Sequence, residues 1–159
     1  MSLGTASIAR AGSARTPKPR PAPVPTEHQE QVALMQWARR HAYQYPELRL
    51  LHAIPNGEKR SRSVANRLKL EGVSPGVPDL FLPAARIAPD ARLRHGLYIE
   101  LKRQRGGSVS PEQKAWHVAL RAQGYEVVVA KGWEAAVAVI RRYLGASEAN
   151  QSNSGGAAA

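Results

Sequence analysis

The sequence predicts an α/β domain in which a mixed central sheet is flanked by helices. Helical and strand-like patterns alternate through residues 26–145, in the order helix, strand, helix, strand, strand, helix, strand, helix. A predicted helix that ends at Gly124 separates two apolar runs, 97–102 and 125–130. Because a helical crossover joins parallel strands, we expect these two runs to pair in parallel, with the earlier strands forming a meander.

The first predicted helix begins with a capping-box pattern, Thr26 followed three residues later by Gln29. We expect this helix to run to about Tyr45, because Pro46 cannot continue it. Glu27 would lie in the first turn, where an acid suits the helix dipole. The predicted buried face consists of apolar residues at helical spacing, namely Val32, Met35, Ala38 and Ala42.

The middle of the chain is predicted to hold two short strands and a basic helix. Residues 48–54 have a strand pattern, and Pro55-Asn56-Gly57 predicts a turn after it. Residues 60–71 have a heavily basic helical pattern. Residues 76–83 indicate a turn that enters a short buried strand, and a connection containing Pro and Arg follows as far as Arg94.

The last third of the domain is predicted as helix, strand and helix. Ser110 and Gln113 form a second capping-box pattern, with Pro111 at the first helical position. The run at 125–130 is rich in β-branched residues, which is typical of a strand buried on both faces. Residues 133–144 have the pattern of an amphipathic helix.

The 159 residues are enough for one domain with a tail at each end. Residues 1–25 are rich in Ala, Ser and Pro and contain basic but no acidic residues, so we expect a flexible basic tail. Residues 146–159 are rich in Ala, Ser, Asn and Gly and are expected to be disordered. The folded domain would therefore span residues 26–145.

The charge balance favours a polyanionic partner, most simply nucleic acid. Lys and Arg number 23 against 12 Asp and Glu, which gives a formal net charge of +11. The absence of cysteine excludes disulfides and thiolate zinc sites. No apolar stretch approaches the length of a membrane span and no targeting signal is evident, so we expect a cytoplasmic protein without membrane contact.

The run at 97–102 carries charged residues on one face of a predicted strand. Alternation puts Tyr98, Glu100 and Lys102 on the face opposite to the apolar residues. If the strand that follows Asp79 pairs alongside, two carboxylates and an amine meet at one place. The alternative is a solvated strand face with a weak ion pair, and a Pro-Asp dipeptide that serves only as a turn.

Two carboxylates about 4 Å apart repel each other by about 4 kcal/mol at an effective dielectric constant near 20. Such a pair persists when a proton is shared, when water surrounds it, or when a cation lies between the two groups. Hard oxygen ligands suit Mg²⁺ or Mn²⁺, which also bind phosphate and water. An adjacent Lys102 could orient the attacking water or stabilise charge that develops on phosphate. This combination of groups is typical of phosphodiester hydrolysis.

Taken with the order of elements, these motifs give a family resemblance over essentially all of residues 26–144. The sequence resembles the PD-(D/E)XK nuclease superfamily, whose restriction-endonuclease-like core is αβββαβ, and more narrowly the stand-alone VRR-NUC family. The resemblance implies a metal-dependent nuclease. The matching residues are Glu27, Ile54-Pro55-Asn56-Gly57, Gly76-Val77-Pro78-Asp79-Leu80, Tyr98-Ile99-Glu100-Leu101-Lys102, Val109-Ser110-Pro111-Glu112-Gln113 and Gly124.

The resemblance implies a site for Mg²⁺ or Mn²⁺ and no organic cofactor. Asp79 and Glu100 match the metal-binding acids of the family, and the carbonyl of Leu101 would be a further metal ligand. Lys102 matches the catalytic lysine. Glu27, the first-helix acid, would approach the same site and hold a water there, although its position also suits a simple first-turn acid.

Gln113 matches the glutamine in the helix that follows the Glu-x-Lys strand, but it also has a structural role as the capping-box partner of Ser110. Stand-alone family members resemble homodimeric enzymes that cut branched DNA, and larger relatives carry the module in DNA repair nucleases. We therefore expect a homodimer that cuts branched or four-way junction DNA. The alternatives are a noncatalytic DNA-binding module on a nuclease fold, and a nuclease that acts on RNA or single-stranded ends.

A set of basic residues around the predicted site is the candidate surface for phosphate contacts, the alternative being a solvated helix face. Few acids interleave with these residues, which favours a nucleic-acid role. His52 and the tryptophans Trp37, Trp116 and Trp133 are expected to pack in the core or, for the tryptophans, in a dimer contact. The candidate phosphate-binding residues are Lys59, Arg60, Arg62, Arg67, Lys69, Arg103 and Arg105.

Overall fold

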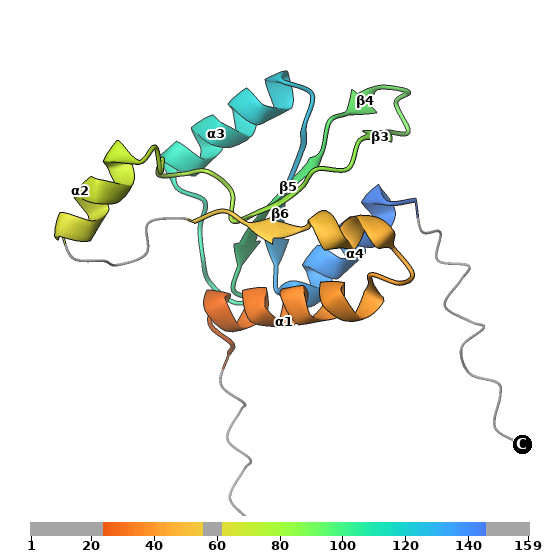
Figure 1. The fold of residues 1–159 in the computed structure, drawn as a ribbon, viewed down its shortest axis with the longest axis horizontal. Coiled ribbons are helices and arrows are strands. Elements are labelled where there is room, and N and C mark those ends of the chain that lie inside the picture. The colour runs from red at the N-terminus through yellow and green to blue at the C-terminus, as the bar shows by residue number, and fades with distance from the viewer. Residues whose placement is uncertain (1–23, 56–61, 146–159) are drawn as a thin grey trace, which may run out of the picture.

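The structure is a computed structural model that describes residues 24–55 and 62–145 of the chain (Figure 1). Its centre is a four-stranded sheet with the order β1-β2-β5-β6. Strands β1 (His52–Ala53), β2 (Leu80–Leu82) and β5 (Leu97–Lys102) pair antiparallel, and β6 (Glu126–Lys131) pairs parallel with β5. The prediction of a mixed sheet built from a meander and one parallel crossover is therefore confirmed.

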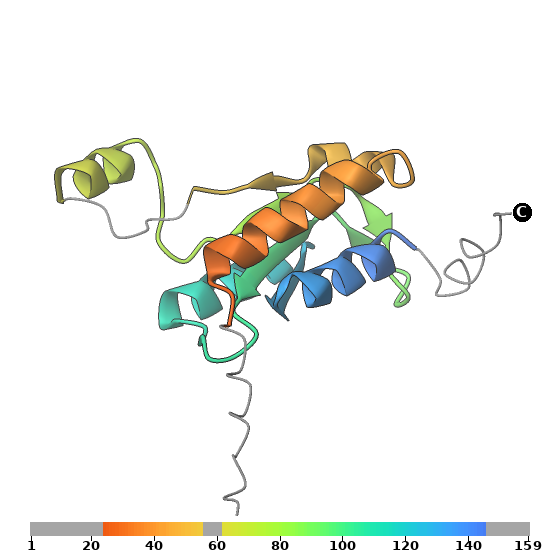
Figure 2. The ribbon, with the colours of Figure 1, turned by 90° about the horizontal axis from the view of Figure 1, so that it is seen from below.

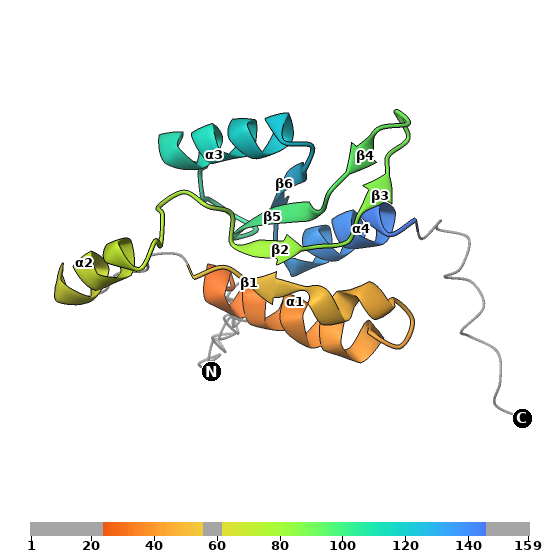
Figure 3. The same ribbon diagram turned by 45° about the horizontal axis from the view of Figure 1, so that its top comes forward.

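Helices cover the two faces of this sheet unequally. Helices α1 (Glu27–His41) and α4 (Trp133–Tyr143) lie side by side against one face (Figure 2). Helix α3 (Pro111–Ala122) lies on the opposite face, over the β6 side of the sheet (Figure 3). The hydrophobic core fills the first face, where residues of β2 and β5 meet both helices: Leu34, Trp37, Leu80, Leu82, Leu97, Ile99, Leu101, Ala136 and Ile140.

The predicted capping box of α1 is present, because Gln29 N–H donates to the Thr26 hydroxyl and Thr26 N–H donates to the Gln29 amide oxygen. The helix ends at His41, one turn before the expected end at Tyr45. The prediction that Val32 is buried is wrong, since its side chain is 41% exposed. Ala38 is buried as predicted, and Met35 and Ala42 pack against the core. The remaining buried residues of α1 are Glu30, Leu34 and Trp37.

The predicted strand at 48–54 is mostly wrong. Residues Pro46–Leu50 form a 3-10 helix, η1, and only His52–Ala53 pair as β1. Pro46 occupies the first position of η1, where its fixed backbone angle favours a helical turn. Leu48 and Leu51 are both buried, and a spacing of three residues matches the 3-10 period rather than the strand period.

The segment after β1 contains a basic helix, as predicted. Helix α2 (Arg62–Leu70) falls within the predicted range 60–71, whose first two residues lie outside the described ones, and it projects from the rest of the domain (Figure 1). The predicted turn at Pro55-Asn56-Gly57 lies largely outside the described residues, as do both predicted tails apart from Val24 and Pro25. The connection at 83–94 contains a two-stranded hairpin that was not predicted, with strands β3 (Arg86–Ile87) and β4 (Leu93–Arg94).

The C-terminal elements agree closely with prediction. The capping box of Ser110 and Gln113 is present at the start of α3. Gly124 ends the turn after α3 with a φ of +80°, and a Cβ added there would lie 2.8 Å from the His95 ring. Within the described residues, no helix is long and apolar enough to cross a membrane.

Candidate active site

Asp79 is held between two strands at the point where β2 begins. Its side-chain Oδ2 accepts a hydrogen bond of 2.8 Å from the backbone N–H of Leu101 in β5. Its backbone carbonyl accepts a hydrogen bond of 2.8 Å from the N–H of Ile54, just after β1. The carboxylate of Asp79 is therefore fixed against the end of β5, as the strand-pairing argument expected.

The turn that precedes Asp79 is packed against the start of α3. Gly76 has a φ of +90°, and a Cβ added there would lie 2.7 Å from the carbonyl carbon of Glu112. The indole N–H of Trp116 donates to the carbonyl of Pro75 over 3.1 Å. A side chain at position 76 would thus combine an unfavourable backbone conformation with a backbone clash, so glycine is required there.

Glu100 lies on the opposite face of β5 from the core residues, yet its side chain is fully buried. Its Oε1 accepts from the Lys102 ammonium over 2.7 Å and also from the Gln113 amide. Its Oε2 has no hydrogen-bond partner within the described residues. The His117 Nε2 faces this oxygen at 3.8 Å and is likewise buried without a partner there.

The titration behaviour of the site reflects burial and two close carboxylates. Burial raises the pKa of the Glu100 carboxyl to about 7; the charge and hydrogen bonding of Asp79 add to the rise, whereas Lys102 opposes it. Burial alone would lower the pKa of Lys102, but Glu100, with Glu27 and Asp79, outweighs burial and raises that pKa. Lys102 therefore stays charged at neutral pH, beside a carboxyl group that readily holds a proton.

The carbonyl of Leu101 is directed toward the Asp79 side of β5. The carbonyls of Gly96 and Lys102 accept from Glu126 and Gly132 on the β6 side. Because alternate residues of a strand direct their backbone groups to opposite neighbours, the groups of Leu101 point toward β2. The hydrogen bond from its N–H to Asp79 agrees with this direction.

Gln113 completes the capping box of α3 and also contacts Glu100. Its Oε1 accepts from the Ser110 N–H over 2.9 Å, which completes the capping box. This bond fixes the orientation of the amide, so its NH₂ group is directed at Glu100. A structural cap and a contact in the site are thus made by the same side chain.

Glu27 is exposed at the start of α1 and lies beside Lys102 rather than between Asp79 and Glu100. A Cβ added at Gly107 would lie 3.4 Å from both the Glu27 Oε1 and the Lys102 Cβ, so these two side chains flank that glycine. Glu27 also contributes to the raised pKa of Lys102. The site therefore lies where β5 ends and where α1 and α3 begin.

The donor set fits a small divalent cation that keeps several waters. Across residues 24–55 and 62–145, no three His, Cys, Asp or Glu side chains are grouped as metal ligands, so Glu27 does not join the acidic pair as a third close ligand. Mg²⁺ is commonly held by one or two carboxylates together with substrate phosphate and water. The unpartnered buried Glu100 Oε2, the neighbouring Asp79 and the Leu101 carbonyl are hard oxygen donors of this kind.

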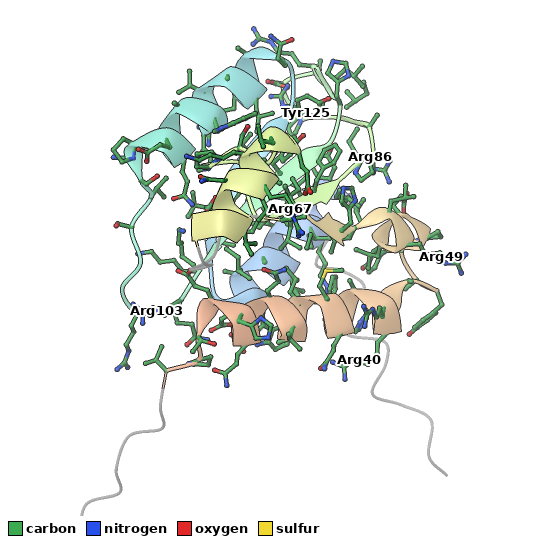
Figure 4. All side chains as sticks on the ribbon, turned by 60° about the vertical axis from the view of Figure 1, so that its left-hand side comes forward. Arg40, Arg49, Arg67, Arg86, Arg103 and Tyr125 are labelled. Carbon is green, nitrogen blue, oxygen red and sulfur yellow. The ribbon has the colours of Figure 1, made fainter. Side chains whose placement is uncertain are left out.

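The candidate phosphate-binding residues are only partly described. Lys59 and Arg60 lie outside the described residues, and Arg62 is placed only as the first residue of α2. Arg67 and Lys69 are exposed on α2, and Arg67 contacts Glu71 at 3.4 Å. Figure 4 shows Arg103 near the N-terminal end of α1, at the opposite end of that helix from Arg40, and Arg105 in the same loop as Arg103 is also exposed.

Two sequence interpretations need correction or extension. His52 was expected to be packed, but it is exposed and contacts the Phe81 ring edge-on. His117 was missed as a site residue, although its position four residues after Gln113 places both on one face of α3. Trp37 is buried and Trp133 packs against the core, so their core assignment is confirmed.

The core elements α1, β1, β2, β5, α3 and β6 have the αβββαβ order, and Asp79, just before β2, meets Glu100 and Lys102 of β5. This arrangement defines a restriction-endonuclease-like fold. The family model described as VRR-NUC domain matches residues 25–134. The chain therefore belongs to the VRR-NUC family, which gives it a nuclease-type function.

A solved structure titled "VRR_NUC domain protein" is similar to this chain, with a TM-score of 0.64 and 32% sequence identity. The match covers 79% of this chain and 93% of the other. No curated protein matches the sequence significantly.

Proposed function

We propose that this chain is a Mg²⁺- or Mn²⁺-dependent endonuclease that hydrolyses phosphodiester bonds in DNA. The observation that carries the proposal is the fully buried Glu100, which meets both Asp79 and the Lys102 ammonium at the end of β5. A buried acid with a raised pKa beside a second acid lowers the stability of a protein. Groups of this kind concentrate at functional sites. The family membership supports the same reaction class.

Asp79 and Glu100 would hold the cation, with the Leu101 carbonyl as a third oxygen ligand. When bound, the cation supplies Lewis-acid chemistry: it neutralises charge on phosphate oxygens and lowers the pKa of a coordinated water. Gln113 keeps the Glu100 carboxylate in place through its amide N–H, and the Leu101 N–H does the same for Asp79. Both acids are therefore oriented before substrate arrives.

Lys102 acts as a fixed positive charge rather than as a base, because its raised pKa keeps it protonated at neutral pH. It stabilises the negative charge that develops on the phosphate during cleavage. Glu27, exposed beside Lys102, is placed to accept a hydrogen bond from the attacking water. Its exposed position suits this role better than direct ligation.

We propose branched DNA as the substrate and a homodimer as the active form. The net charge of +11 and the exposed basic residues of α2 and of the loop after β5 support a phosphate-binding surface around the site. Binding should weaken steeply with salt, and each lost phosphate contact should reduce the slope of log K against log salt by about 0.9. Measuring this slope for Arg103→Ala and Arg105→Ala tests the surface, and an unchanged slope in both variants would remove these residues from it.

The direct test replaces each acid by its amide. Asp79→Asn and Glu100→Gln should reduce the Mg²⁺-dependent cleavage rate by about 10³-fold or more, as loss of a principal electrostatic group does, while DNA affinity in EDTA changes little. Glu134→Gln, at an exposed acid of α4, is the matched control and should cleave normally. Survival of cleavage in either site variant would make the assignment wrong.

The same assay separates the alternative functions. Cleavage of four-way, flapped, linear and single-stranded DNA, and of RNA, is compared with and without EDTA. A preference for branched DNA supports the proposal. If only RNA or only single-stranded ends are cleaved, they are the substrate in place of branched DNA. If substrates are bound but none is cleaved, the chain is a noncatalytic DNA-binding module.

A further inference from the structure

Five rings from separate parts of the chain meet beside the candidate active site. The Phe81 and Tyr98 rings stack, with centroids 4.3 Å apart and an interplanar angle of 18°. The Tyr125 ring packs edge-on against both of them. The His52 ring meets Phe81 edge-on, and the His95 ring meets Tyr125. We refer to these five rings as the aromatic platform.

The aromatic platform shares a sheet face with the acidic site. Tyr98, Glu100 and Lys102 alternate along β5, so their side chains lie on the same face. Tyr98 is two residues from Glu100, about 7 Å along the strand. Phe81 stands directly opposite Tyr98 in the β2–β5 register, which extends the platform across the sheet.

The outer part of the platform reaches solvent. His52 and His95 are exposed, and Phe81, Tyr98 and Tyr125 are half-buried. α3 packs over the β6 side of this face, away from His52 on the edge strand β1. Neither phenol hydroxyl of Tyr98 or Tyr125 makes a hydrogen bond within the described part of the chain, unlike Tyr143, whose hydroxyl donates to the Ala84 carbonyl.

We infer that the aromatic platform binds an unpaired nucleobase of the DNA strand whose phosphate reaches Asp79 and Glu100. This inference rests on the proposed nuclease function and narrows its substrate class. Aromatic side chains stack on exposed bases with little regard to sequence, and each stacked base contributes about 1–3 kcal/mol. A base within a duplex is already stacked, so it gains nothing from the platform.

Two features favour a nucleotide over an apolar protein surface as the occupant. The platform is continuous with the acidic site along β5, so a nucleotide next to the phosphate at Glu100 would lie within reach of Tyr98. Its exposed rim is made of His52 and His95, whose ring nitrogens can donate to phosphate or base oxygens. The substrate would therefore contain an unpaired nucleotide next to the bond that is cut, as at a flap or a branch point.

The test measures binding in EDTA, so that it does not depend on cleavage. The probe is a duplex with a short single-stranded flap that carries 2-aminopurine at the first unpaired nucleotide, and the comparison is the fully paired duplex. Full-length wild-type protein should quench the 2-aminopurine fluorescence by stacking. Tyr98→Leu should abolish this quenching and weaken flap binding by about 5- to 150-fold, with paired-duplex affinity unchanged.

Two further variants act as controls. Tyr98→Phe keeps the ring and should bind the flap like the wild type, whereas Phe81→Leu should reproduce the loss. Absence of quenching in the wild-type protein would overturn the inference without any variant. Equal loss of flap and duplex binding in Tyr98→Leu, or dissociation of a dimer seen by sedimentation, would also overturn it in favour of a structural or subunit-contact role.

The outcome is separable from that of the proposed function. If Asp79→Asn still cleaves DNA while Tyr98→Leu loses only flap binding, the catalytic assignment fails and the platform stands. If Asp79→Asn abolishes cleavage and Tyr98→Leu binds the flap normally, the nuclease site stands and the platform fails.

Discussion

The two faces of β5 are built from alternate residues of the same six-residue strand, and they do different work. Leu97, Ile99 and Leu101 are buried in an apolar core between the sheet and helices α1 and α4. On the other face, Tyr98, Glu100 and Lys102 meet rings, a second acid and α3. We therefore expect the apolar face to supply most of the stability of the fold. The charged face should lower the free energy of unfolding, because it contains a buried acid.

The core face should show the larger effect on stability. Ile99→Ala removes a fully buried side chain and should lower the free energy of unfolding by about 2–5 kcal/mol. The measurement is urea denaturation at pH 7, with Val32→Ala as the control because Val32 is exposed on α1. A loss below about 1 kcal/mol for Ile99→Ala would contradict the assignment of this face as the core.

Because of Glu100 on the charged face of β5, the free energy of unfolding should fall as pH rises. Burial raises the pKa of Glu100 from its ordinary value of 4.5, which the unfolded chain retains, to about 7 in the folded protein, so the folded state binds an extra proton between these two pH values. Stability that is present below pH 4.5 is therefore lost as pH rises toward 7. The loss amounts to about 3 kcal/mol, from 1.36 kcal/mol for each pH unit.

This effect is isolated by comparison with Glu100→Gln, which cannot ionise at that position. The difference in unfolding free energy between wild type and variant, measured by urea denaturation in EDTA, should change by about 3 kcal/mol between pH 4.5 and pH 7. If this difference in unfolding free energy stays constant with pH, burial does not raise the pKa of Glu100.

The smallest effect concerns the side chain that links α3 to the site. Gln113→Ala and Gln29→Ala each remove the N3 partner of a capping box, and each should cost about 1 kcal/mol in stability. Only Gln113 contacts Glu100, so only Gln113→Ala should also slow cleavage. Equal cleavage rates for the two variants would reduce Gln113 to a purely structural cap.

Much of this site could be predicted because it depends on local patterns. The alternation at 97–102 determined both faces of β5, and the two capping boxes placed the starts of α1 and α3. The side chains of Glu100 and Lys102 are neighbours for the same reason, since residues two apart share a strand face.

The failures depend on contacts that no local pattern reveals. The apolar run at 48–54 is compatible with strand or 3-10 helix, and the burial of Leu48 and Leu51 against the core decides between them. His117 becomes a neighbour of Glu100 only because α3 packs with Gln113 inward. The aromatic platform joins rings that are far apart in sequence, so only the sheet register brings Phe81 to Tyr98.

We propose that Asp79 and Glu100 together bind a divalent cation. The most direct measurement is thermal unfolding of the full chain at pH 7 with increasing Mn²⁺, in the absence of DNA. The account predicts that Mn²⁺ stabilises the wild type in a saturable way, by about 2.7 kcal/mol at one hundred times its Kd, and leaves Glu100→Gln unaffected. An equal stabilisation of both proteins, or none of the wild type, would contradict it.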